Sequence, residues 1–202
     1  MIAIIDYGVG NLFSLSSSFH AIGHDTVVTG DAAVIRKAHK LVLPGVGAFE
    51  DAIAKLRNTG LDKVIREEVS SGKPLLGICL GMQMLFERSY EYGVHQGLGL
   101  IKGEVIPMEN TIPGDLKIPH IGWNSLNITK ENPLLKYVKN GDFVYFVHSY
   151  YASNCADSVI ATTEYGKALT AAVAMGHVYG CQFHPEKSGP ALQGRLPGDD
   201  RI

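Results

Sequence analysis

A cysteine, a histidine and a glutamate lie where two apolar segments end, and together they could perform nucleophilic chemistry. Cys79 stands between Gly77 and Gly81, after the apolar run 74–78 and before a segment with helical spacing. Gly-x-Cys-x-Gly copies the nucleophile elbow Gly-x-Ser-x-Gly, whose glycines remove side chains that would collide in a strained turn. A helix starting there would offer unpaired N–H groups to a thiolate and to an oxyanion beside it. The elbow alone fits an inert buried cysteine equally well.

A thiol nucleophile needs a base, and His184 is placed to supply it. His184 ends an apolar segment and precedes Pro185, which fixes the backbone, and Glu186, whose carboxylate can reach the imidazole. A carboxylate bonded to one ring nitrogen holds the tautomer whose other nitrogen accepts the thiol proton. Without Cys79, residues 184–186 fit a turn with a surface ion pair. Five other histidines lie in polar or turn-like surroundings: His20, His24, His39, His95 and His177.

The elements that must position these residues follow from the hydrophobic pattern. Strand-like runs (2–6, 25–28, 40–45, 74–78) alternate with helix-like segments (11–22, 48–57, 61–71). This alternation predicts an α/β fold, with a mostly parallel central sheet and helices on both faces. The second half is β-rich, in segments 99–108, 142–151, 158–165, 169–176 and 177–186, and should extend the sheet in mixed or antiparallel fashion. Cys79 and His184 would then meet at the carboxyl edge, where such sheets bind ligands.

Composition limits the classes of function. The chain has 202 residues, 46% of them hydrophobic, which suits one domain, and its net charge of −2 comes without a run of Lys and Arg. Nucleic acid and membranes are therefore not expected as partners. Three widely spaced cysteines fit neither a disulfide scaffold nor a zinc site, and they suggest a reducing cytoplasm and no metal. No cofactor is expected, because no dinucleotide fingerprint or phosphate loop is complete.

Several motifs in combination resemble a known family. The segments "GICLGMQ" and "CQFHPEKS" resemble the triad-type (class I) glutamine amidotransferases. Within that group, "IDYGVGNL", "LPGVGAFEDA", "IPHIGWN" and "FVHSYY" resemble the glutaminase subunits of imidazole glycerol phosphate synthase, which act in histidine biosynthesis. The resemblance covers residues 1 to about 188, which we assign to one amidotransferase domain.

The resemblance implies a mechanism and a set of site residues. Cys79 would attack the side-chain amide of glutamine, His184 would move the proton to departing ammonia, and Glu186 would orient His184. Water would then hydrolyse the glutamyl thioester. The oxyanion would be held by the N–H of Leu80, by elbow geometry, and by the turn 44–47 with Val46 and Gly47. The residues implied for glutamine binding are Gln83, Glu91, Ser149 and Tyr150.

The family also implies a partner. A (β/α)8-barrel cyclase subunit would receive the ammonia and form a heterodimer with this chain. The residues implied to face it are Trp123, Asn124, Tyr145 and Lys187. On sequence alone a core role for Trp123, the one tryptophan, is equally consistent. Three alternatives stay open: another cysteine hydrolase of this fold, a glutaminase serving the synthase of pyridoxal phosphate or guanylate, and a non-catalytic binding subunit.

The last residues depart from the family, which usually ends in an amphipathic helix with several leucines. Here 189–202 read "GPALQGRLPGDDRI", and Pro190, Pro197 and three glycines oppose a helix. We therefore expect an irregular, loosely packed tail and a lower stability.

Overall fold

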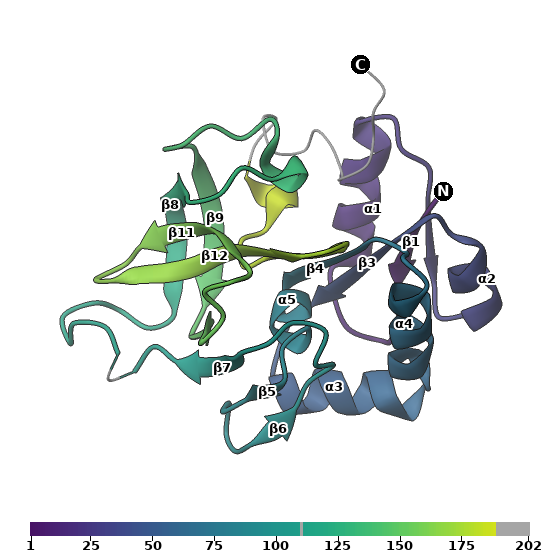
Figure 1. Ribbon diagram of the computed structural model, residues 1–202, viewed down its shortest axis with the longest axis horizontal. Helices are drawn as coiled ribbons and strands as arrows, with labels where there is room; N and C mark the ends of the chain where they lie inside the picture. Colours follow the sequence, from purple (N-terminus) through teal and green to yellow (C-terminus); the bar gives the residue numbers. More distant parts are fainter. Residues whose placement is uncertain (110, 189–202) are drawn as a thin grey trace.

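The computed structural model describes residues 1–109 and 111–188, which are built around one nine-stranded sheet (Figure 1). From edge to edge the strands are β2 (Thr26–Thr29), β1 (Ile2–Ile5), β3 (Lys40–Gly45), β4 (Leu75–Cys79), β13 (Val178–Cys181), β12 (Ala168–Met175), β11 (Val159–Glu164), β8 (His120–Ile128) and β9 (Phe143–His148). Neighbours from β2 to β13 run parallel, and those from β13 to β9 run antiparallel. The parallel half followed by an antiparallel extension confirms the predicted α/β fold.

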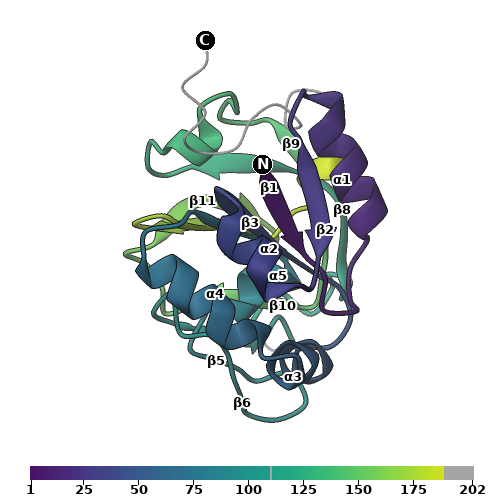
Figure 2. The ribbon, with the colours of Figure 1, turned by 90° about the vertical axis from the view of Figure 1, so that its right-hand side faces the viewer.

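Helices cover both faces of this sheet. On one face lie α2 (Ala32–Lys37), α3 (Phe49–Asn58), α4 (Leu61–Ser70) and the short α5 (Leu80–Met84), which share one buried cluster. On the other face α1 (Leu12–Ala21) packs in a second cluster with residues of β8 and β9. Figure 2 shows α1 on the opposite side of the sheet from α3 and α4. Two short 3-10 helices, η1 (Pro133–Leu135) and η2 (Pro185–Lys187), follow β8 and β13 in the chain.

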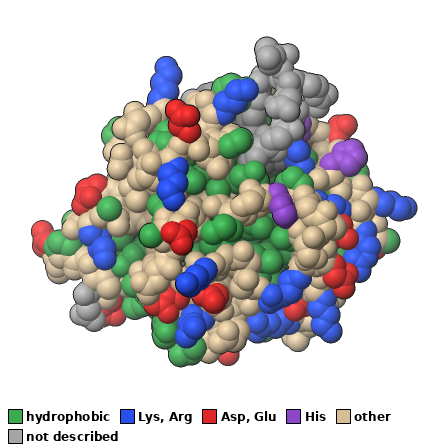
Figure 3. Space-filling view, viewed as in Figure 1, with side chains coloured by type: hydrophobic (Ala, Val, Ile, Leu, Met, Phe, Trp, Pro, Cys, Tyr) green, Lys and Arg blue, Asp and Glu red, His purple; other side chains and the backbone are tan. Residues whose placement is uncertain are grey.

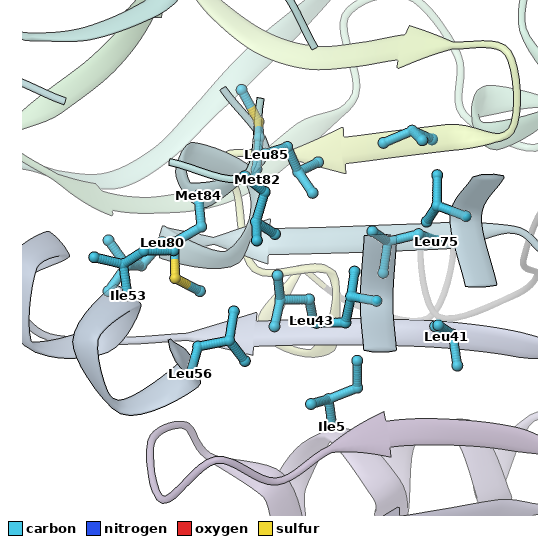
Figure 4. Close-up of a cluster of buried hydrophobic side chains, with 14 of the residues drawn as sticks. Ile5, Leu41, Leu43, Ile53, Leu56, Leu75, Leu80, Met82, Met84 and Leu85 are labelled. Carbon is cyan, nitrogen blue, oxygen red and sulfur yellow. The ribbon is translucent and has the colours of Figure 1, made fainter. Parts of the chain in front are cut away.

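The core fixes the relative positions of β3, β4 and α5. Along α3 the buried side chains recur at helical spacing, at Phe49, Ala52, Ile53 and Leu56. Figure 4 shows the side chains of α3, β3 and α5 converging between the sheet and its helices, where each buried leucine-sized side chain stabilises the fold by about 1.5–3 kcal/mol. The carboxyl ends of β3 and β4 are therefore held side by side, with Gly45 opposite Cys79.

A second, four-stranded sheet was not foreseen in the sequence. Its order is β10 (Tyr150–Ser153), β7 (Glu104–Pro107), β5 (Arg88–Ser89) and β6 (His95–Gln96). Segment 99–108, expected to extend the main sheet, contributes β7 to this one instead. Segment 142–151 is divided at Ser149 between β9 of the large sheet and β10 of the small one. The carbonyl of Ser149 accepts a hydrogen bond from the N–H of Met108 at 2.9 Å, which ties the dividing point to the small sheet.

Acidic and basic side chains are interspersed on the face seen in Figure 3. Within residues 1–109 and 111–188, no helix combines the length and the apolar character needed to cross a membrane. The predicted irregular tail, 189–202, lies outside the described residues.

Candidate active site

The turn between β4 and α5 carries Cys79 in a backbone conformation that few non-glycine residues adopt. Cys79 has φ 54° and ψ −113°, and α5 begins at the next residue. A Cβ atom on Gly77 would come within 2.7 Å of the carbonyl oxygen of Gly81, and one on Gly81 would collide with the carbonyl oxygen of Leu43. Both glycines are therefore required by close backbone approach, and the strain holds the thiol at the end of the strand.

His184 and Glu186 reach the same edge from the neighbouring strand. β13 runs parallel to β4, with Cys181 opposite Ile78, so the chain after β13 emerges beside Cys79. The Nδ1 atom of His184 lies 2.8 Å from Oε1 of Glu186, and each side chain is only 6% exposed. The carboxylate thus fixes the imidazole with Nε2 available for other chemistry.

Opposite charges stabilise the protonated form of His184. Burial lowers its pKa, but the hydrogen bonds and negative charges of Cys79 and Glu186 raise the pKa overall, to about 9. The imidazolium form of His184 is therefore favoured near neutral pH.

The segment carrying His184 is held by the outer edge of β9. The N–H of His184 donates to the carbonyl of Tyr145 at 2.9 Å. The N–H of Tyr145 in turn donates to the hydroxyl of Ser188 at 3.0 Å. These bonds hold the chain on both sides of Glu186, through the backbone of His184 and the side chain of Ser188.

One glutamine contacts the thiol and a second glutamine bonds to the first, and the one in contact was not singled out in the sequence. The Nε2 atom of Gln182 lies 3.7 Å from the sulfur of Cys79, and Gln83 bonds to both Gln182 and the carbonyl of Tyr150, each at 3.0 Å. On another side the thiol faces the carbonyl of Val147 at 4.0 Å. The sequence could have indicated Gln182, because it lies two residues before His184 at the end of a strand. Residues two apart in a strand share a face, so both side chains are expected on the same side.

Two buried histidines were also missed. Nδ1 of His148 lies 2.8 Å from the carbonyl of Tyr150, so it must donate and Nε2 must accept. Nδ1 of His120 lies 3.3 Å from that Nε2. Burial lowers the pKa of His148 to about 3, assisted by the charges of His120 and His184 and opposed by the bond to Tyr150. His148 is therefore a neutral hydrogen-bonding group beside the site.

A cavity of about 530 Å³ joins most of the residues expected from the sequence. Its lining includes Cys79 and His184, the turn residues Val46 and Gly47, and Leu80. All four residues expected to bind substrate also line it: Gln83, Glu91, Ser149 and Tyr150. Within the described chain no group of three or more His, Cys, Asp or Glu side chains could hold a metal ion.

The turn 44–47 is held at both ends. The hydroxyl of Tyr7 donates to the carbonyl of Pro44 at 2.7 Å. Beyond the turn, Oε2 of Glu91 accepts the N–H of Phe49, also at 2.7 Å. Burial raises the pKa of Glu91, while the Phe49 bond and the charge of His95 lower it. Between these anchors Gly47 has φ 87°, which the other residue types rarely adopt.

The four residues expected to face a partner lie outside the cavity, and we call them the rim: Trp123, Asn124, Tyr145 and Lys187. Trp123 is 59% exposed, which excludes a core role within this chain. It pairs with Tyr145 across β8 and β9, with ring centroids 4.8 Å apart. Nζ of Lys187 lies 5.5 Å from the Tyr145 ring centroid on another side. The side chain of Asn124 instead donates to the carbonyl of Glu164 on β11.

Comparisons with known proteins agree with this geometry. The family model described as "Glutamine amidotransferase class-I" matches residues 3–197. This chain belongs to the class-I glutamine amidotransferase family. The amidotransferase is 52% identical over 190 residues to the imidazole glycerol phosphate synthase subunit HisH of Caldanaerobacter subterraneus subsp. tengcongensis, covering 94% of this chain and 92% of that protein. It is 51% identical to the HisH subunit of Lactococcus lactis subsp. lactis, over 93% and 92% of the two chains.

Solved structures show the same fold at low sequence identity. A crystal structure of a glutamine amidotransferase aligns with a TM-score of 0.74 at 17% identity, covering 95% of this chain and 94% of that one. The structure of PurLQS from Thermotoga maritima aligns with a TM-score of 0.69 at 20% identity, over 96% and 91%. These likenesses confirm the amidotransferase fold.

Proposed function

We propose that this chain is the glutaminase subunit of an imidazole glycerol phosphate synthase and acts in histidine biosynthesis. It hydrolyses glutamine to glutamate and ammonia. The observation that carries the proposal is the convergence of Cys79 and His184 in one cavity, with His184 held 2.8 Å from Glu186. The HisH relatives, half identical over nearly the whole chain, favour this synthase over others. Retention of all three triad residues argues against a non-catalytic subunit.

In the proposed mechanism the Cys79 thiolate attacks the amide carbon of glutamine and forms a carbon–sulfur bond. The imidazolium of His184 gives its proton to the departing nitrogen, and ammonia leaves as the carbon–nitrogen bond breaks. Water then adds to the thioester while His184 takes its proton. When the carbon–sulfur bond breaks, its electron pair returns to sulfur and glutamate is released. Glu186 stabilises the charged imidazole throughout.

The tetrahedral oxyanion needs two hydrogen-bond donors aimed at one point. The N–H of Leu80 follows the nucleophile on the elbow and supplies one. The turn 44–47 supplies the other, from the peptide N–H of Val46 or Gly47. Both residues line the cavity with Cys79, and one oxyanion donor of this kind contributes about 2.7–4 kcal/mol to the transition state.

The other cavity residues suit the amino-acid end of glutamine. The carboxylate of Glu91 supplies negative charge for the α-ammonium group. Gln83 uses its Nε2 within the protein, which leaves Oε1 as a further acceptor. Ser149 and Tyr150 contribute backbone groups where the chain passes from β9 to β10. We assign these four residues to substrate binding.

The rim is assigned to a cyclase partner of the (β/α)8-barrel type, which forms a heterodimer with this chain and receives the ammonia. Trp123 and Tyr145 form an exposed aromatic pair, and aromatic side chains of this kind commonly anchor interfaces. Lys187 lies three residues after His184, and its Nζ is 5.5 Å from the centroid of the Tyr145 ring. The free thiols of Cys79, Cys155 and Cys181 are consistent with the cytoplasm as the place of action.

A glutaminase assay tests the proposal. Glutamate release is measured for the chain alone, with the cyclase subunit, and with the cyclase subunit and its nucleotide ligand. We expect slow hydrolysis by the chain alone and a higher rate with partner and ligand, because the partner favours an aligned oxyanion turn. A Cys79→Ala chain is the matched control. Equal turnover with and without the cyclase subunit contradicts the assignment to this synthase.

A further inference from the structure

We propose that Gln182 is a catalytic residue, whose side-chain amide donates a hydrogen bond to the Cys79 thiolate, and that Gln83 is the positioning residue that holds this amide in its donating orientation. The inference deepens the proposed function, because it gives the nucleophile a third partner besides His184 and the elbow backbone. It rests on a chain of three hydrogen bonds from Tyr150 to the sulfur.

The orientation of the Gln182 amide follows from its neighbours. The carbonyl of Tyr150 can only accept, so the Gln83 atom 3.0 Å from it must be Nε2. The same Nε2 lies 3.0 Å from Gln182, which must present its Oε1 there, since two amide nitrogens would oppose donor to donor. Nε2 of Gln182 is then the atom directed at the sulfur, at 3.7 Å. The carbonyl of Tyr150, a fixed backbone acceptor, thus determines the orientation of both side-chain amides.

Burial makes this arrangement rigid. Gln182 is 0% exposed and Gln83 is 5% exposed. The backbone N–H of Gln182 also donates to the carbonyl of Ala171 at 2.8 Å, which holds the residue in the sheet. A buried amide turned the other way would leave polar atoms opposed and is strongly disfavoured. The donor is therefore preorganised before substrate arrives.

The chemistry at the sulfur explains what the donor does. The carbonyl of Val147, 4.0 Å away, accepts from the protonated thiol and favours that form. The amide of Gln182 favours the thiolate, because a hydrogen bond to an ionised acceptor is about twice as strong as one between neutral groups. The same donor acts twice in the cycle. It stabilises sulfur as the attacking thiolate, and again when the carbon–sulfur bond of the thioester breaks and the electron pair returns to sulfur.

Alkylation of Cys79 tests the inference without glutamine. The rate of reaction with iodoacetamide is measured as a function of pH in the full chain, with mass spectrometry identifying the modified residue. In Gln182→Met, which keeps the volume and removes the donor, we expect the rate profile to move to higher pH by about one unit, or about tenfold in rate at a fixed pH below the midpoint. Gln182→Glu replaces the donor with an acceptor and should move the profile further in the same direction.

Two further variants separate orientation from packing. Gln83→Met removes the bond that holds the Gln182 amide, which can then turn. This variant should reproduce part of the shift in the rate profile, although Gln83 makes no hydrogen bond to the sulfur itself. Gln96→Met, on the exposed strand β6, is the control and should leave the profile unchanged. Melting temperatures show which variants fold. If Gln182→Glu does not fold, the result for Gln182→Met alone tests the inference. An unchanged profile in a folded Gln182→Met chain overturns the inference. A wild-type chain that lacks glutaminase activity even with the cyclase subunit and its nucleotide ligand overturns the proposed function instead.

Discussion

The hydroxyl of Tyr7, two residues after the end of β1, donates a 2.7 Å hydrogen bond to the carbonyl of Pro44, the first residue of the turn 44–47. Tyr7 is 4% exposed, and burial and the nearby Cys79 raise its pKa, so the hydroxyl keeps its proton and remains a donor. Gly10 approaches the same proline, since a Cβ atom there would lie 3.4 Å from the Pro44 ring. The segment after β1 therefore sets where the turn begins.

Removing this hydroxyl should affect both stability and catalysis. In Tyr7→Phe the buried Pro44 carbonyl loses its donor, which we expect to cost about 1 kcal/mol in the free energy of unfolding. A less constrained turn should also lower kcat for glutamine more than it changes KM. Denaturant unfolding and steady-state kinetics measure the two effects. Ser158→Ala is the control, because it removes a buried 2.9 Å bond from a hydroxyl to the carbonyl of Cys155, and neither residue lines the cavity. Equal kinetic effects of the two changes would contradict this role of Tyr7.

Only one of the three cysteines should be needed for glutamine hydrolysis. Cys155 and Cys181 are buried, and burial raises the pKa of both thiols, which keeps them protonated and unreactive. We expect Cys79→Ala to abolish glutamate release, while Cys155→Ala and Cys181→Ala retain it. The assay is run with the cyclase subunit present. Hydrolysis by a Cys79→Ala chain would refute the thioester mechanism.

The buried His148 should make the fold sensitive to acid. Its pKa falls from 6.5 in the unfolded chain to about 3 in the folded one, chiefly through burial. Between these pH values His148 is protonated in the unfolded chain but not in the folded one. Its contribution to the free energy of unfolding is therefore fully present above pH 6.5 and is lost as pH falls toward 3. The slope contributed is up to about 1.4 kcal/mol per pH unit. His120, whose pKa is also lowered by burial, acts in the same direction.

Urea unfolding at pH 7 and pH 5 measures this effect. His148→Asn should reduce the difference in stability between the two pH values, whereas His20→Asn, at an exposed position, should not. His184 has the opposite effect on the pH dependence of stability. Because its folded pKa is raised to about 9, its contribution is present below pH 6.5 and is lost as pH rises through 9. Identical pH dependence of the wild type and His148→Asn would show that the buried imidazole is not the titrating group.

The aromatic pair of the rim should govern partner affinity. Trp123→Ala is expected to weaken binding of the cyclase subunit by about 2 kcal/mol or more, since a central aromatic anchor carries much of the energy of an interface. The stability of the isolated chain should change by less than about 0.5 kcal/mol, because the side chain is already exposed. Titration calorimetry with the cyclase subunit gives the affinity. Tyr137→Ala, an exposed aromatic residue outside the rim, provides the comparison, and equal losses for both variants would remove Trp123 from the interface.

The parallel half of the fold could be predicted because its signals are local. Strands such as β3 and β4 are continuous apolar runs, and the elbow glycines are required by contacts that the motif itself encodes. Helix α2 was missed because it has only six residues, although Asp31 caps it through a 2.7 Å bond to the N–H of Ala33. Strand β8 was seen only as a motif, since Gly122 interrupts its pattern.

The rest depends on contacts between distant segments, which a single sequence does not specify. Alternation along 142–151 predicts a strand but not that Ser149 divides it between two sheets. Likewise, Tyr7 meets Pro44 across 37 positions, and Gln83 meets Gln182 across 99. The contact between His184 and Glu186 could be predicted because one short motif contains both residues. The groups that support the triad became visible only when the chain was folded.

The hydrogen bonds that join Tyr145 to His184 and Ser188 have a consequence for aggregation. β9 is the last strand of the large sheet, and an unpaired strand edge is a template on which another chain can assemble. Here the outer edge of β9 is hydrogen-bonded at Tyr145 by His184 and Ser188, which flank Glu186 in residues 184–188. If residues 184–188 detach from β9, the imidazole of His184 moves out of the site and the backbone groups of Tyr145 become available to pair with another chain. Residues 184–188 therefore have two structural roles, because they cover part of this strand edge and also position the imidazole of His184.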